Sequence, residues 1–185
     1  MKNLLELPDN LPVPVDDGAC DHLLGYRIPS LPLPGVSGGM TDVGAIKGQL
    51  VLYFYPMNGR PDAPPLIGWN DIPGARGCTP QACAFRDNYQ VMTQLGAKVF
   101  GISAQPLPEQ QEAHTRLHLP FELLNDSDLA LSRALRLPMF DYGAARFLKR
   151  LTLIAKDGRI EKVFYPVFPP DSNATGVIAW LTMPR

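Results

Sequence analysis

The chain has 185 residues, of which 45% are apolar and 19% charged, and its formal net charge is −1. This composition supports a substantial hydrophobic core and predicts a single domain over residues 1–185. A charge near zero provides no basic surface for nucleic acid or an anionic membrane, and no apolar run reaches the roughly 18 residues of a transmembrane helix. We therefore expect neither a nucleic-acid-binding protein nor a membrane protein.

The first residues, MKNLLELPDNLPVPVDDG, contain one lysine followed by acids and prolines. They lack the apolar stretch and the small-residue cleavage site of a secretory signal. We therefore expect a cytoplasmic protein. Structural disulfides are rare in that reducing compartment, whereas reactive cysteines occur there.

The 20 prolines are concentrated in residues 8–34 and 56–80. The first cluster predicts an extended, proline-rich N-terminal arm over residues 1–34. The second predicts a long loop over residues 57–77, and a loop of that length inside a compact domain is usually functional or mobile.

Apolar periodicity predicts alternating strands and helices after the arm. QLVLYFYP (49–56) is an almost purely apolar run, typical of a strand buried on both faces. Thr79 as N-cap and Pro80 in the first turn predict a helix to about Gln94, with Gly96 as a stop. The remaining predicted elements are a strand over 97–103, a helix over 106–118, a strand over 121–124, a helix over 126–137, a hairpin over 150–167 with an Asp157-Gly158 turn, and a helix over 170–183.

This order of elements determines the expected fold class. Strands that alternate with helices form parallel pairs through helical crossovers, and the hairpin adds antiparallel strands. The sequence therefore predicts an α/β sandwich, with a mixed central sheet and helices on both faces.

Two of the three cysteines lie close together in RGCTPQACAFRD (76–87), whereas Cys20 lies alone in the arm. A structural zinc site needs four ligands, usually with Cys-x2-Cys pairs, but the spacing here is Cys-x4-Cys and the three histidines are scattered. We therefore predict no metal. Small buried cysteines without chemistry remain an alternative for the pair, and for Cys20 this is the favoured interpretation.

A redox role for the pair has physical support. Cys78 lies at the mouth of the predicted helix, where unpaired backbone N–H groups and the helix dipole favour a thiolate. Arg76 and Arg86 are near it in sequence, and Gly74 and Gly77 would let a small substrate approach the backbone closely.

Cys83 follows Cys78 by five positions, inside the predicted helix. Residues with this spacing in a regular helix have Cα atoms about 8–9 Å apart. A disulfide needs less than about 7 Å. A bond between these two cysteines would therefore require the first helical turns to unwind, which ties the chemistry to local unfolding.

The segments VLYFYP, GCTPQACAFRD, KVFGIS and LPFELLNDSD, followed by a strand with an Asp-Gly turn, resemble a peroxiredoxin. The most similar group is peroxiredoxin Q, the bacterioferritin-comigratory-protein branch, over about residues 27–182. This resemblance implies a thioredoxin-like fold and thiol-dependent reduction of hydrogen peroxide or organic hydroperoxides. It implies no metal, flavin or haem cofactor.

The resemblance also implies roles for individual residues. Cys78 matches the peroxidatic cysteine, whose thiolate attacks the peroxide O–O bond and becomes a sulfenic acid. Cys83 matches the resolving cysteine, which forms an intramolecular disulfide that a thioredoxin-like reductant reopens. The family's active-site arginine matches Arg150 or, counting back from the Asp-Gly turn, Lys149. Arg150 is favoured because a guanidinium keeps its charge and can donate two hydrogen bonds.

The chain departs from the family signature Pro-x-x-x-Thr-x-x-Cys, which would place proline at Asp71 and threonine at Ala75. The threonine hydroxyl normally helps to bind the peroxide. We expect Thr79, or the backbone N–H groups of Gly77 and Cys78, to substitute for it.

A second departure is the length of the loop before the motif. Pro56 precedes Cys78 by 22 positions, which implies about 15 inserted residues. Trp69 in this insertion either lines the pocket or belongs to a packed surface excursion. Both departures favour an alternative function, a thioredoxin-fold redox-sensing or binding protein whose thiol pair does not turn over. The sequence leaves open whether the protein is a monomer or a homodimer.

Overall fold

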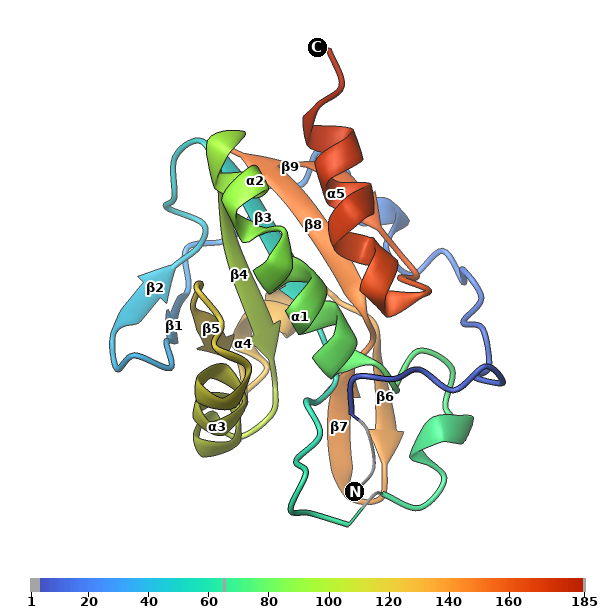
Figure 1. Cartoon of the computed structure of the whole chain (residues 1–185). Helices are drawn as coiled ribbons and strands as arrows, with labels where there is room; N and C mark the ends of the chain where they lie inside the picture. The colour runs from blue at the N-terminus through green and yellow to red at the C-terminus, as the bar shows by residue number, and fades with distance from the viewer. Residues whose placement is uncertain (1–3, 65, 185) are drawn as a thin grey trace.

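A computed structural model of the protein describes residues 4–64 and 66–184. Its central sheet has the strand order β5-β4-β3-β8-β9 (Figure 1). These strands are β3 (Gln49–Phe54), β4 (Ala97–Ser103), β5 (Leu123–Asn125), β8 (Leu151–Lys156) and β9 (Arg159–Phe164). The β5-β4-β3 pairs are parallel, and the β3-β8 and β8-β9 pairs are antiparallel. The sheet is therefore mixed, as the sequence predicts.

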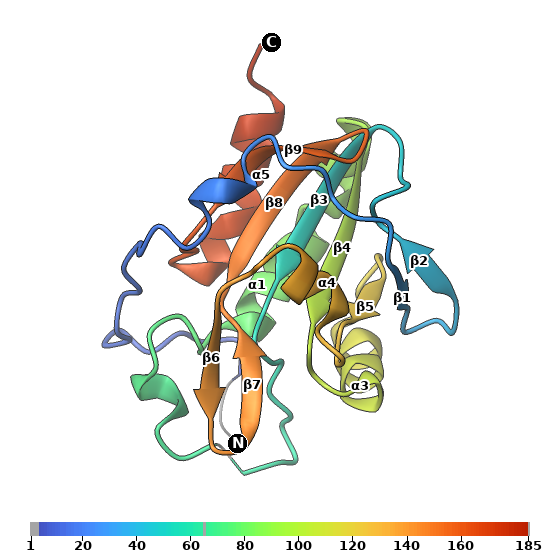
Figure 2. The ribbon, with the colours of Figure 1, turned by 180° about the vertical axis from the view of Figure 1, so that it is seen from behind.

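Helices lie on both faces of this sheet. They are α1 (Cys78–Asp87), α2 (Tyr89–Gln94), α3 (Leu107–Leu117), α4 (Ala130–Ala134) and α5 (Asn173–Leu181), with short 3-10 helices η1 (Asp21–Leu23), η2 (Trp69–Asp71) and η3 (Pro170–Ser172). Figure 1 shows α1, α2 and α5 on one face, and Figure 2 shows α4 and the N-terminal segment on the other. The α/β class with a mixed sheet and two helical faces is thus confirmed.

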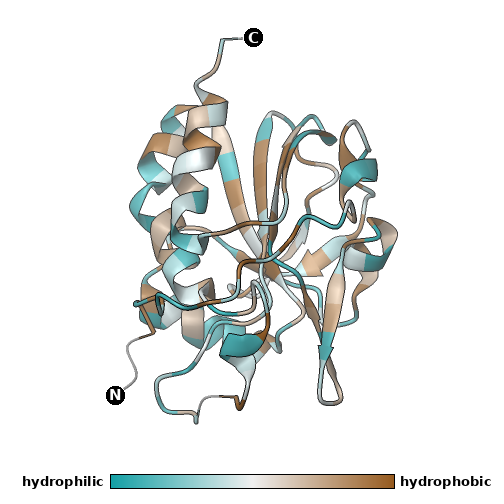
Figure 3. Ribbon diagram, turned by 90° about the vertical axis from the view of Figure 1, so that its right-hand side faces the viewer, coloured by the Kyte–Doolittle hydropathy of each residue, from teal (hydrophilic) through white to brown (hydrophobic). Residues whose placement is uncertain are grey.

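Alternate residues of β3 contribute to two hydrophobic cores, one on each face of the sheet. Leu50, Leu52 and Phe54 pack with the N-terminal segment and α4, and Val51 and Tyr53 pack with α1 and α5. The side view in Figure 3 shows apolar strands between the helical layer and the remaining chain. Five of the six β3 residues are buried, as expected for a strand covered on both faces.

The helix that carries the cysteine pair differs from the prediction at both ends. α1 begins at Cys78 with Gly77 as its N-cap, whereas the sequence predicted Thr79 as the N-cap and Pro80 as the first helical residue. The single helix expected to Gln94 is interrupted at Asn88, whose Nδ2 donates to the Ala84 carbonyl oxygen at 2.8 Å. A side chain that bonds the backbone in this way competes with the regular helical pattern.

Other elements are shorter than predicted. The helix expected over 126–137 is only α4, because the Asp126 carboxylate accepts hydrogen bonds from the N–H groups of Leu131 and Ser132 at 3.1 and 2.9 Å. The closing helix starts as η3 and ends at Leu181, and the strand expected over 121–124 is β5. The Asp157-Gly158 hairpin is present as β8-β9.

Two antiparallel pairs have no counterpart in the predicted elements. They are β1 (Pro32–Pro34) with β2 (Met40–Asp42), and β6 (Met139–Tyr142) with β7 (Ala145–Leu148). Figures 1 and 2 show that the β6-β7 hairpin, the loop after β3 and the N-terminal segment gather at one end of the molecule. The N-terminus of α1, which begins at Cys78, lies at this end.

The N-terminal arm is more ordered than an extended tail. It contains η1 and β1, and Leu23, Ile28 and Leu33 are buried in the core beneath α4. Residues 1–3 of the predicted arm and residue 65 of the predicted loop lie outside the described residues. Within the described part of the chain, no helix is long and apolar enough to cross a membrane.

Candidate active site

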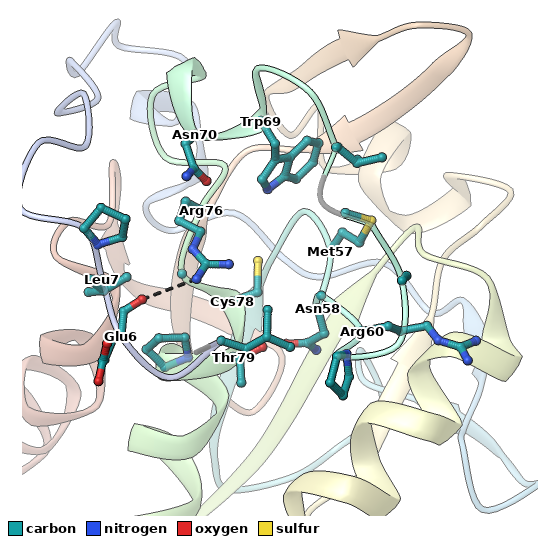
Figure 4. A pocket seen from close by; sticks show the side chains of 18 of the residues that line it. Glu6, Leu7, Met57, Asn58, Arg60, Trp69, Asn70, Arg76, Cys78 and Thr79 are labelled. Carbon is teal, nitrogen blue, oxygen red and sulfur yellow. Dashed lines mark hydrogen bonds between the residues drawn. The ribbon is translucent and has the colours of Figure 1, made fainter. Parts of the chain in front are cut away.

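Cys78 is the first residue of α1, and its side chain lines a large cavity (Figure 4). Gly77 turns the chain into the helix with a φ of +107°, a conformation that strains any other residue. A Cβ at this position would also clash with the Pro170 ring and come within 2.9 Å of Leu7 Cδ2. N–H groups of the first helical turn have no intrahelical acceptor, so this end of α1 carries partial positive charge beside the sulfur.

Arg150, which immediately precedes β8, is the cation that the fold brings to this sulfur. Its side chain is buried, and Nη2 lies 3.2 Å from Cys78 Sγ. The same nitrogen lies 3.2–3.3 Å from the carbonyl oxygens of residues 74–76, and Nη1 donates to Gln81 Oε1. These partners hold the guanidinium against the sulfur and orient it.

Lys149 lies at the surface instead. Its side chain is 37% exposed, and Nζ pairs with the Asp17 carboxylate at 2.8 Å. Hydrogen bonds from Lys149 and Tyr165 lower the pKa of Asp17 to about 2. The neighbouring cation is therefore engaged with the N-terminal arm, and Arg150 alone of the two contacts Cys78.

A buried chain of hydrogen bonds extends from Arg150 across three elements. Gln81 Nε2 in α1 donates to Asn173 Oδ1 in α5 at 3.0 Å, and Thr152 Oγ1 in β8 donates to the same oxygen at 2.7 Å. All three side chains are buried. This network fastens the first turn of α1, and sequence reasoning missed it because its members are 21 to 92 residues apart.

Cys83 lies inside the intact α1 and is a free thiol, as are the other two cysteines. Burial raises the pKa of Cys83, and the nearby Arg86 guanidinium opposes that rise. Arg86 itself is held by Asp87 and by the Leu117 carbonyl oxygen, at 2.8 and 2.9 Å. Cys20 belongs to the core on the other face of the sheet, where burial and nearby aspartates raise its pKa to about 12.

The cavity above Cys78 has a volume of about 890 Å³. Its walls come from the N-terminal arm, the inserted loop, the first turn of α1 and Glu109. Trp69 lines it and packs its other edges against Phe140 and Phe147 of the β6-β7 hairpin, with ring centroids 5.8 and 5.0 Å away. The insertion therefore forms a wall of the pocket. No group of three or more His, Cys, Asp or Glu side chains in residues 4–64 and 66–184 could hold a metal ion.

Comparison with known proteins identifies the family. Residues 24–178 match the Redoxin family. The chain belongs to the Redoxin family.

The relatives of this Redoxin are peroxiredoxins of the Q and bacterioferritin-comigratory type, which confirms the resemblance. It is 28% identical over 150 residues to the chloroplastic peroxiredoxin Q of Oryza sativa subsp. japonica, covering 80% of this chain and 62% of the rice protein. It is 26% identical over 187 residues to that of Gentiana triflora, covering 98% and 79%. The chain thus spans only about six tenths of the length of the rice relative.

Solved structures confirm the thioredoxin-like fold of this Redoxin. Peroxidoxin BcpB from Mycobacterium tuberculosis superposes with a TM-score of 0.72 at 23% identity, covering 88% of this chain and 97% of the other. The bacterioferritin comigratory protein of Xanthomonas campestris gives 0.66 at 21% identity, covering 93% and 97%.

Ala75 stands at the position where the family signature would place a threonine. It is fully buried, and its carbonyl oxygen accepts from the Cys78 thiol at 3.7 Å, but it offers no side-chain hydroxyl. Gly77 and the buried Thr79 line the cavity beside Cys78. Asn58, from the loop after β3, lines the same cavity and was not anticipated.

Proposed function

We propose that this Redoxin is a thiol-dependent peroxidase that reduces hydrogen peroxide or organic hydroperoxides, with Cys78 peroxidatic and Cys83 resolving. The observation that carries the proposal is the buried Arg150 guanidinium 3.2 Å from Cys78 Sγ, at a helix N-terminus that opens on a cavity. A cation and a helix N-terminus at one sulfur favour its thiolate, which is the nucleophilic form.

The first step is attack of the Cys78 thiolate on one peroxide oxygen. An S–O bond forms and the O–O bond breaks, so that the sulfur is oxidised to sulfenic acid and the peroxide is reduced. The leaving oxygen departs with the electron pair of the broken bond and takes a proton from water. Arg150 stabilises the thiolate and the charge that develops on oxygen, and Gly77 and Thr79 border the peroxide.

The second step joins the two cysteines of one chain. The Cys83 thiol attacks the sulfenic sulfur, which forms the disulfide and releases water. Because Cys83 lies in the intact α1, the first turns of that helix must unwind for the sulfurs to meet. A thioredoxin-like dithiol then reduces the disulfide by exchange. The bacterioferritin comigratory protein of Xanthomonas campestris has alkyl peroxide reduction activity, which supports the proposed peroxidase function.

We further propose that residues 1–185 act as one thioredoxin-like domain in the cytoplasm, as a monomer or homodimer, with no nucleic-acid or membrane partner. The net charge of −1 and the two cores that share one sheet support this proposal. Described residues of the 1–34 arm and of the 57–77 loop line one cavity, which supports including both segments in this domain.

The test is peroxide consumption in the presence of thioredoxin, thioredoxin reductase and NADPH. We expect Cys78→Ser to abolish turnover and Cys20→Ala to retain it. Cys83→Ser should react once and then stop, and mass spectrometry after a peroxide pulse should show a 78–83 disulfide in the wild type. Normal turnover by Cys78→Ser would refute the proposal.

The alternative is a redox sensor whose thiol pair does not turn over, and Ala75 in place of the family threonine favours it. A sensor would be oxidised slowly and stoichiometrically, without sustained consumption of peroxide in the same assay. Turnover that scales with the thioredoxin concentration would exclude it.

A further inference from the structure

We propose that Asn58 binds the peroxide, with its side-chain amide taking the place of the threonine hydroxyl that is absent at Ala75. This inference deepens the proposed peroxidase function and rests on it.

Asn58 is 2% exposed, and neither its side-chain Oδ1 nor its Nδ2 makes a well-formed hydrogen bond to a described residue. A buried amide without partners is costly, because it has lost its hydrogen bonds to water and gained none from the protein. Native proteins contain few such groups, and each calls for an explanation. A ligand that binds at this point would provide the missing partners.

The backbone of Asn58 is firmly held, although its side chain is not. Asn58 N donates to Gln105 Oε1 at 2.9 Å, and Gln105 Nε2 donates back to the Asn58 carbonyl oxygen at 3.0 Å. Gln105 is itself buried and also accepts at its backbone oxygen from Asn125 Nδ2 at 2.7 Å. The amide is therefore presented from a rigid support, which is how a binding group is preorganised.

Asn58 and Cys78 line the same cavity, the first from the loop after β3 and the second from α1 (Figure 4). Tyr55 directly follows β3, and its hydroxyl is buried. Burial raises the pKa of Tyr55, the Cys78 charge raises it further, and the nearby Asn58 amide opposes the rise.

A side-chain amide can both donate and accept hydrogen bonds, as a threonine hydroxyl can, and so can bind a hydroperoxide in the same way. Asn58 Oδ1 can accept the peroxide O–H, and Nδ2 can donate to the oxygen on which negative charge develops as the O–O bond breaks. The amide is neutral, so it does not repel the Cys78 thiolate as a carboxylate would. Arg150 and Asn58 would then contact the peroxide from two different elements.

The test compares Asn58→Leu and Asn58→Ala with Asn70→Leu, a matched control because Asn70 lines the same cavity but is exposed. Two rates are measured on the reduced protein: single-turnover oxidation by hydrogen peroxide, and alkylation of Cys78 by iodoacetamide, which needs no peroxide-binding group. We expect the Asn58 variants to lose about 10- to 100-fold in peroxide rate, as for the removal of one donor to a developing charge. Alkylation should change little, the control should match the wild type, and Asn58→Leu should melt no lower than wild type.

Three results would overturn the proposal. An unchanged peroxide rate would show that Asn58 does not bind the peroxide, and an equal fall of both rates would show that it only shapes the surroundings of Cys78. An equal loss in Asn70→Leu would show a general effect of the cavity wall. A wild-type protein that does not react with peroxide would refute the peroxidase function itself, which a defect confined to the Asn58 variants cannot do.

Discussion

Of two cations adjacent in the chain, Arg150 contacts Cys78 and Lys149 does not. Arg150 is buried and lies 3.2 Å from the sulfur, whereas Lys149 is exposed and pairs with Asp17. The guanidinium is planar and has several donors, so it can contact the sulfur and the carbonyls of residues 74–76 together. An ammonium group cannot reproduce that geometry.

We therefore predict that Arg150→Leu lowers the single-turnover rate with peroxide by about 10- to 100-fold, the value of a charge-assisted hydrogen bond. Unlike the Asn58 variants, it should also slow alkylation of Cys78 at pH 7, because the thiolate loses its cation. Lys149→Leu is the matched control and should react like the wild type. Arg150→Lys should recover part of both rates. Equal effects of Arg150→Leu and Lys149→Leu would contradict this assignment.

The three thiols should differ in reactivity because their surroundings differ. Only Cys78 lines the cavity, while burial raises the pKa of Cys83 and raises that of Cys20 to about 12. Iodoacetamide near neutral pH should label Cys78 first and Cys20 least, as judged by peptide mass spectrometry. Rapid labelling of Cys20 in the folded protein would contradict the structure.

The same raised pKa predicts a pH dependence of stability. The folded protein keeps the Cys20 proton up to about pH 12, whereas the unfolded chain releases it near the ordinary value of 9.0. The stabilisation is therefore complete below pH 9 and is lost as the pH rises toward 12. Urea unfolding at about pH 8.5 and 10.5 should show a smaller loss of unfolding free energy in Cys20→Ala than in the wild type. Identical losses of unfolding free energy in the two proteins would contradict the raised pKa of Cys20.

In the proposed mechanism, the helix α1 presents Cys78 to the peroxide and then unwinds to release Cys83. The buried chain of Gln81, Asn173 and Thr152 joins its first turn to α5 and β8, and so opposes the unwinding that a disulfide requires. Tyr53 adds to this hold, because its ring stacks on Phe85 of α1 with centroids 4.5 Å apart. In the proposed mechanism, we therefore expect the stability of the first turn of α1 to limit the rate of disulfide formation.

We predict that Asn173→Ala speeds formation of the 78–83 disulfide after a peroxide pulse, while the first step with peroxide keeps its rate. Its cost in unfolding free energy should be about 1–3 kcal/mol, because Gln81 and Thr152 lose a buried acceptor. Asn88→Ala, which removes a side-chain bond at the other end of α1, is the control and should leave disulfide formation unchanged. Quenched-flow mass spectrometry measures both steps. Slower disulfide formation in Asn173→Ala would refute the coupling.

Three segments far apart in the chain build the cavity at one end of the molecule. The arm and the inserted loop form walls, and the β6-β7 hairpin supports Trp69 from behind. The volume of about 890 Å³ is much larger than hydrogen peroxide needs, since a water molecule occupies only about 30 Å³. We therefore expect the cavity to admit a hydroperoxide with a bulky organic group.

We predict that the wild type reduces cumene hydroperoxide at least as efficiently as hydrogen peroxide. Ala63 is an exposed residue of the cavity wall, and Ala63→Trp would fill part of the space without touching Cys78. This variant should lose efficiency with cumene hydroperoxide and keep it with hydrogen peroxide, measured as kcat/KM in the thioredoxin-coupled assay. Equal losses with both substrates would show that the cavity does not select for size.

Several features were predictable because they depend on neighbours in the chain. The apolar run of β3 and the Asp157-Gly158 turn determine local structure, and the motif around Cys78 places that sulfur at a helix start. The β6-β7 hairpin was not predictable in this way, because its residues are largely exposed or half-buried and it is stabilised by Trp69, which lies some seventy positions earlier. The N-cap was misplaced at Thr79 because the requirement for glycine at residue 77 comes from Pro170 and Leu7.

The sequence by itself determined the α/β class, the mixed sheet and the position of Cys78 at a helix N-terminus, since these follow from local patterns of apolar residues and turn residues. Tertiary structure alone decided that Arg150 reaches the sulfur, 72 positions away, and that Gln105 holds the backbone of Asn58 across 47 positions. The physical reason is that hydrogen-bond partnership and burial depend on segments that meet only when the sheet and its loops have folded together.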